Sequence, residues 1–124
     1  MTRLTNETQQ RPLNVGIVGL GRLGQRHALN LLQHVSGVIL VAACSPVECE
    51  REWARSALGL NSLYHDYDHF LQHDALDAVF LVTPTALHPD QIIQAVQAGK
   101  HVFCEKPLSL DLADCQRVTA VTQQ

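Results

Sequence analysis

Residues 15–24 read Val-Gly-Ile-Val-Gly-Leu-Gly-Arg-Leu-Gly, an apolar run that leads directly into Gly19-x-Gly21-x-x-Gly24. Glycines at this spacing between a strand and a helix are typical of a turn that binds a pyrophosphate. The first permits the tight turn, the second lets the backbone approach the phosphates, and the third lets the helix pack on the strand. The N–H groups that open the helix then face the anion. The predicted contacts are Gly19, Leu20, Gly21, Arg22, Leu23 and Gly24.

Strands and helices are expected to alternate along the chain. The predicted strands are 14–18, 38–44, 62–64, 78–82 and 101–104, and the predicted helices are 21–34, 48–58, 66–73, 89–98 and a last one from about 111. Gly59 and Gly99 are expected to end their helices, and Asp66 to cap one. Right-handed crossovers between such units predict an α/β fold. We therefore expect a Rossmann-type, open, doubly wound parallel sheet of three layers in a single domain.

Apolar spacing also predicts which side chains the helices bury. The expected buried sets are Ala28, Leu31, Leu32 and Val35 in the first helix, Cys49, Trp53, Ala57 and Leu58 in the second, Ile92, Ile93 and Val96 in the fourth, and Leu112, Cys115 and Val118 in the last.

The composition fits one globular domain. Of 124 residues, 46% are hydrophobic and 17% charged, so a packed core is expected. A formal net charge of −3 provides no basic field for nucleic acid, and no apolar run approaches the ~20 residues that a bilayer span needs. Residues 1–12 are polar and are expected to form a flexible tail without a signal core. The four cysteines form no CxxC pair, so we expect reduced thiols and a cytoplasmic location.

Three further motifs follow the glycine-rich turn: Thr83-Pro84-x-x-x-His88, Ala98-Gly99-Lys100-His101-Val102 and Cys104-Glu105-Lys106-Pro107. Together the four motifs resemble the nucleotide-binding domain of the Gfo/Idh/MocA oxidoreductases, named after glucose–fructose oxidoreductase and inositol dehydrogenase. The resemblance runs from about Asn14 to the C-terminus, and the inositol dehydrogenase-like members are the most similar.

This resemblance implies a cofactor, NAD or NADP, and a role for several residues. Thr83 and Pro84 would lie beside the nicotinamide ribose with His88 close by. Glu105 would contact the ribose region of the cofactor. Lys106 would be the catalytic-site lysine, which holds a substrate hydroxyl while hydride leaves the same carbon.

Members of this family carry a second domain, which shapes a sugar or polyol pocket and supplies an Asp…His pair for proton transfer. The chain, with a dinucleotide-binding domain at 13–124, is therefore expected to be truncated before the last strand and the substrate domain, and inactive alone. Bare apolar surface at that edge predicts self-association. The alternative is a stand-alone, non-catalytic nucleotide-binding or regulatory module, or the relic of a truncated gene.

Ser45 stands where a carboxylate usually reads the adenosine ribose, about 20 residues beyond the glycines. Because serine is uncharged, this position does not repel the 2′-phosphate of NADP as a carboxylate would. Pro46 and Val47 occupy the places of the usual cation, while Arg51 and Arg55 lie further along, and Glu48 is a candidate for the ribose. The sequence therefore leaves the choice of cofactor open.

Histidines 65, 69 and 73 are spaced by four residues and raise the question of a metal site. The expected helix there is short, and exposed polar side chains explain the pattern without a ligand set. We therefore expect no metal.

Overall fold

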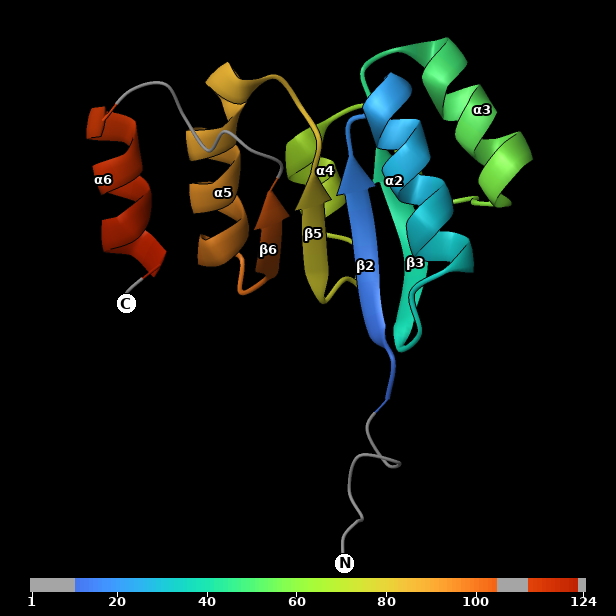
Figure 1. Cartoon of the computed structure of the whole chain (residues 1–124), viewed down its shortest axis with the longest axis horizontal. Helices are drawn as coiled ribbons and strands as arrows, with labels where there is room; N and C mark the ends of the chain where they lie inside the picture. The colour runs from blue at the N-terminus through green and yellow to red at the C-terminus, as the bar shows by residue number, and fades with distance from the viewer. Residues whose placement is uncertain (1–10, 105–111, 123–124) are drawn as a thin grey trace, which may run out of the picture.

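The computed structural model describes residues 11–104 and 112–122, in which strands and helices alternate (Figure 1). The strands are β2 (Leu13–Val18), β3 (Val38–Cys44), β4 (Leu63–Tyr64), β5 (Ala78–Leu81) and β6 (His101–Cys104). The helices are α2 (Arg22–Gln33), α3 (Glu48–Leu58), α4 (Tyr67–Leu71), α5 (His88–Gln97) and α6 (Leu112–Thr122), with a 3₁₀ turn at Thr85–Leu87. The expected alternation is confirmed.

The five strands form one parallel sheet in the order β4-β3-β2-β5-β6. From β2 the chain winds outward through β3 to β4, then returns to the other side of β2 for β5 and β6. This reversal makes the sheet doubly wound, as predicted. In such sheets ligands bind in the crevice at the carboxyl ends of the strands, where the winding changes direction.

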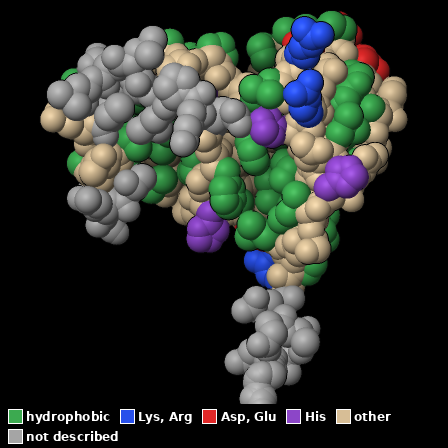
Figure 2. Space-filling model, in the orientation of Figure 1, with side chains coloured by type: hydrophobic (Ala, Val, Ile, Leu, Met, Phe, Trp, Pro, Cys, Tyr) green, Lys and Arg blue, Asp and Glu red, His purple; other side chains and the backbone are tan. Residues whose placement is uncertain are grey.

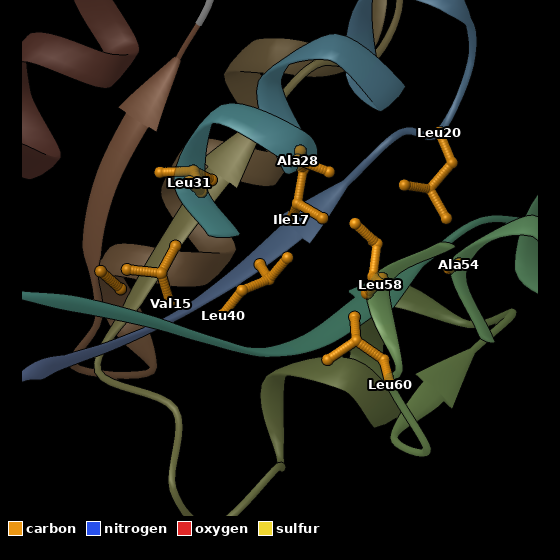
Figure 3. Packing of buried hydrophobic residues seen from close by; sticks show 11 residues of the cluster. Val15, Ile17, Leu20, Ala28, Leu31, Leu40, Ala54, Leu58 and Leu60 are labelled. Carbon is orange, nitrogen blue, oxygen red and sulfur yellow. The ribbon is translucent and has the colours of Figure 1, made fainter. Parts of the chain in front are cut away.

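Two apolar layers hold the helices on opposite faces of the sheet. One packs α2 and α3 against β2 and β3, with Ile17 and Ala28 fully buried between them (Figure 3). The other joins α4, α5 and α6 to the opposite face, around Phe70, Ile92 and Val118. The three-layer architecture is thereby confirmed.

The predicted buried faces of the helices were partly wrong. Leu32 in α2 and Val35, which lies beyond the end of that helix, are 42% and 43% exposed. In α3, Cys49 and Ala57 are exposed and Ala54 is buried instead. The buried face of α2 consists of Gly24, Ala28 and Leu31, and that of α3 consists of Ala54 and Leu58. Apolar periodicity locates a stripe but does not say which edge of it contacts the sheet. Leu112 and Cys115 are not among the residues whose side chains the structure describes.

Most of the predicted helix-ending residues lie where the structure ends its helices. Gly59 and Gly99 follow α3 and α5 with positive φ angles of +69° and +81°. Asp66 precedes α4 as expected, but its side chain makes no capping hydrogen bond, and its carbonyl oxygen accepts one from the Phe70 N–H instead. Within the described ranges, every helix is too short or too polar to cross a bilayer.

Candidate functional site

The segments that follow β2, β3, β4 and β5 surround a cavity of about 520 Å³ at the carboxyl edge of the sheet. Its walls are the turn after Val18, the turn from Cys44 to Val47, and the turn from Val82 to Pro84. The remaining described lining residues are Glu50, His65, Tyr67, Leu87 and Gln91. This is the crevice that the doubly wound topology predicts.

The glycine-rich turn has a different physical requirement at each glycine. Gly19 has a φ of +100°, and a Cβ there would overlap the backbone carbonyl of Val82. Gly24 lies against the carbonyl of Gly19, so a Cβ would separate α2 from the turn. Gly21 lines the cavity, and no atom lies within 4 Å of the position a Cβ would take. Gly19 and Gly24 are therefore needed for packing, and Gly21 keeps a space open.

That space suits a diphosphate. Gly21 precedes α2 with extended backbone and no side-chain cap, and the first turn of the helix contains no acidic residue. The first N–H groups of a helix have no partner within it and attract anions. The bare backbone and the free helix end together fit the pyrophosphate of a dinucleotide.

Ser45 directly follows β3 and is buried, with 1% of its surface exposed. Its hydroxyl donates to Oε1 of Glu50 over 2.6 Å and accepts from the N–H of Val47 over 3.1 Å. Its carbonyl oxygen accepts a 2.7 Å hydrogen bond from Nη1 of Arg51. The serine therefore holds the start of α3 against the end of β3.

Thr83 and Pro84 line the opposite wall and depend on α5 for their position. The Thr83 hydroxyl donates to Oε1 of Gln91 over 2.5 Å. His88 is 1% exposed, and its Nε2 lies 2.7 Å from the Thr83 carbonyl oxygen. Because a carbonyl only accepts, Nε2 carries the proton in this bond. His88 thus holds the turn in place through this hydrogen bond. It is not among the residues that line the cavity.

The other predicted contacts differ in position. Arg22 and Leu23 are exposed at the start of α2 and do not line the cavity, and Gly24 is buried beneath it. Glu105 and Lys106 lie outside the described residues. Glu48, the candidate for the ribose, is exposed and not part of the lining. The roles assigned to all of these residues remain predictions.

Sequence reasoning missed Glu50, His65, Tyr67 and Gln91 as lining residues. Glu50 carries a usable signal, since it stands in the first turn of a helix that begins just after a strand ends at the cavity. Tyr67 and Gln91 come from α4 and α5, and the Tyr67 hydroxyl donates to the Gln91 carbonyl oxygen over 2.7 Å. Nothing in the local sequence marks this pair, because only the packing of the two helices joins them.

The wall at the end of β3 includes a thiol that stays protonated. Burial is the main cause that raises the pKa of Cys44 to about 12, and the charge of Asp66 adds to it. Burial also raises the pKa of the Tyr67 hydroxyl. Both groups are therefore neutral at physiological pH.

The three spaced histidines have separate neighbours. Nδ1 of His73 is hydrogen-bonded to the Tyr64 hydroxyl over 2.9 Å, His69 packs edge-on against the same ring, and His65 lines the cavity. In the part of the chain that the structure describes, no group of three or more potential ligands is placed to hold a metal ion.

A family model described as an oxidoreductase family with an NAD-binding Rossmann fold matches residues 13–124. The chain belongs to the Gfo/Idh/MocA oxidoreductase family. It is the NAD-binding Rossmann domain of that family, and the resemblance seen in the motifs is confirmed.

Relatives of known activity lie within the same family. The NAD(+)-dependent scyllo-inositol 2-dehydrogenase of Bacillus subtilis is 39% identical over 105 residues, which are 85% of this chain and 31% of the relative. A scyllo-inositol dehydrogenase from Lactobacillus casei, solved with NAD(H) and scyllo-inositol, is 43% identical with a TM-score of 0.89. The match covers 92% of this chain and 34% of that one.

A further structural neighbour binds the other cofactor. A 3-ketoreductase from Actinomadura kijaniata, solved with TDP-benzene and NADP, is 31% identical with a TM-score of 0.81. Its match covers 91% of this chain and 35% of the neighbour. The chain thus spans about a third of the length of the relatives it matches. Structural neighbours of the chain are thus solved with NAD(H) and with NADP.

Proposed function

We propose that this chain is the cofactor-binding part of an oxidoreductase that acts on a CH–OH group of a sugar or polyol, with an inositol-like substrate. The observation that carries the proposal is the open space at Gly21, at the mouth of a cavity on the carboxyl edge of the sheet. Relatives that are named inositol dehydrogenases support the substrate class. They also favour an enzyme over a non-catalytic binding module.

In this proposal each wall of the cavity has a task. The turn at Gly19, Leu20 and Gly21 and the first turn of α2 hold the pyrophosphate, and Arg22 and Leu23 complete the set. Thr83 and Pro84 contact the nicotinamide half, supported by His88. When bound, the nicotinamide ring accepts or donates a hydride.

The catalytic contribution of the chain itself is assigned to the segment after β6. That strand ends at Cys104, which is in register with Leu81 at the edge where the cavity lies. We propose that Lys106 holds the substrate hydroxyl and that Glu105 contacts the cofactor ribose. The chain of 124 residues alone is expected to bind dinucleotide without turnover of inositol.

Calorimetric titration of the chain with NAD(H) and NADP(H) tests the binding half of the proposal. The informative variant is Gly21→Ser, because the backbone at Gly21 is extended and serine is a good helix N-cap. We expect its thermal stability to be preserved while its side chain occupies the open space and lowers affinity at least roughly tenfold. Flat titrations of the unaltered chain with both cofactors would sink the proposal, as would unchanged affinity in Gly21→Ser.

We also propose that the chain self-associates through an apolar face on β5 and β6. On the side of the sheet that α2 covers, β5 and β6 present Phe80 and Phe103, with ring centroids 6.3 Å apart. These rings and Val35 border an apolar groove of about 240 Å³ (Figure 2 shows hydrophobic side chains gathered on this face). Phe103 is 50% exposed, and a second copy of the chain would cover it. The cytoplasmic location stays a proposal from the sequence.

A further inference from the structure

The cavity is lined by a carboxylate that bears on the choice between NAD and NADP. Among its described lining residues Glu50 is the one carboxylate, and none is a lysine or arginine. Glu50 reaches this place from the first turn of α3, six residues after the end of β3 at Cys44. A carboxylate therefore stands at the cavity even though Ser45 occupies the position where the strand usually supplies one.

Ser45 fixes this carboxylate and has no proton left for a ligand. Its hydroxyl hydrogen is given to Oε1 of Glu50 at 2.6 Å, and its oxygen accepts from Val47. With 1% of its surface exposed, the serine is covered by its neighbours. Within the described part of the chain no donor is bonded to Oε2 of Glu50, so that oxygen is open to a hydroxyl group.

We propose that Glu50, positioned by Ser45, accepts the adenosine ribose hydroxyl and makes this chain select NAD(H) over NADP(H). This inference rests on the proposed dinucleotide binding. A hydroxyl at the 2′ position donates to a carboxylate in a charge-assisted bond. A phosphate at the same position carries negative charge and is repelled by it.

The two arginines of α3 do not offset this charge. Arg51 gives Nη1 to the Ser45 carbonyl oxygen and is not part of the cavity lining. Arg55 lies a turn further along α3, where it pairs with Glu52 over 3.0 Å at the surface. The placement of Glu50 therefore favours NAD over NADP, a choice that Ser45 leaves open in the sequence. The carboxylate proposed to meet the ribose is Glu50 and not Glu48, which lies outside the cavity.

The test compares Glu50→Gln with Glu48→Gln by calorimetric titration with NAD+ and NADP+ separately. Both changes turn a carboxylate into an amide in the first turn of α3 and alter net charge equally, but Glu48 is exposed outside the cavity. We expect the unaltered chain and Glu48→Gln to bind NAD+ at least roughly tenfold more tightly than NADP+. In Glu50→Gln the ratio should fall to about threefold or less, mainly through tighter NADP+ binding. The preference of the unaltered chain should also weaken as salt is raised.

Ser45 is tested as a positioning residue. Ser45→Ala keeps the Glu50 charge but frees its side chain, so NAD+ affinity should fall several-fold, with a smaller gain for NADP+ than in Glu50→Gln. Ser45→Thr retains the hydroxyl and should recover NAD+ affinity. Circular dichroism checks that each variant is folded.

Each result has one consequence. If the unaltered chain binds neither cofactor, the proposed function fails and this inference fails with it. If it binds NADP+ as tightly as NAD+ or more tightly, only the inference fails. Equal shifts in Glu50→Gln and Glu48→Gln would assign the preference to general charge and would overturn the role of Glu50.

Discussion

The imidazole of His88, at the first residue of α5, donates from Nε2 to the carbonyl oxygen of Thr83 over 2.7 Å. The ring is 1% exposed, so the bond is shielded from water and ties a helix to the turn that ends β5. We expect His88→Ala to lower the free energy of unfolding by about 2–3 kcal/mol through the lost bond and the cavity left behind. Cofactor affinity should fall several-fold, because the Thr83 wall loses its support.

Urea denaturation and calorimetric titration measure these two effects. The control is His101→Ala, which removes an exposed histidine at the start of β6 and should change stability by less than about 0.5 kcal/mol. A His88→Ala protein as stable as this control would contradict the proposed support of the turn.

Gly19 and Gly37 offer a matched pair for the glycine-rich turn. Both have positive φ, +100° and +79°, so alanine is strained at either position by about 1–2 kcal/mol. At Gly37 a Cβ meets open space, whereas at Gly19 it overlaps the Val82 carbonyl, which belongs to the backbone. We expect Gly19→Ala to be clearly less stable than Gly37→Ala in thermal melts. Equal melting temperatures would show that the turn relaxes away from β5.

Gly16 lies in the middle of β2, and its missing side chain makes room for an aromatic ring. A Cβ there would stand 2.5 Å from Cζ of Phe70, which is fully buried. Gly16→Ala should therefore cost about 1–3 kcal/mol of stability through overpacking. Adding Phe70→Leu should recover part of this loss, so a double-mutant cycle in urea should give a favourable coupling between the two changes. Additive losses would mean that the ring is not the obstacle.

Acid should weaken one link at the amino end of the sheet. The pKa of Asp77 is lowered from 3.8 to about 2, first by its hydrogen bond from Arg11 and then by the N–H of Asn14. A carboxyl group with a lowered folded pKa stabilises the fold above its unfolded value and loses that effect as pH falls through the folded one.

Melting temperatures between pH 5 and pH 2 test this link. The unaltered chain should lose stability more steeply than Asp77→Asn between about pH 4 and pH 2. Asp74→Asn, which alters an exposed carboxylate in the preceding turn, is the control and should follow the unaltered chain. Parallel curves for all three proteins would rule out a contribution from Asp77.

Self-association should depend on the aromatic pair of β5 and β6. We expect light scattering to show dimers or larger species of the unaltered chain that dissociate on dilution. Phe103→Gln should shift the chain toward monomer. The control is Ile39→Gln, which changes a residue of similar exposure, 48% against 50%, on β3, across β2 from β5 and β6. A clean monomer of the unaltered chain at high concentration would refute the proposed contact.

The sequence by itself determined the fold class, the strands to within a residue or two, the glycine-rich turn and the family. These features are local, because each depends only on residues that are close together in the sequence. They include the strand runs, the glycine spacing and the helix ends at Gly59 and Gly99. Only the tertiary structure decided which side chains meet at the cavity. Glu50 lies at the cavity with its carboxylate bonded to the Ser45 hydroxyl, and His88 donates to the Thr83 carbonyl oxygen, because packing sets α3 and α5 against the ends of β3 and β5. That packing joins residues far apart in the sequence, and periodicity along one helix carries no information about the surface that faces it.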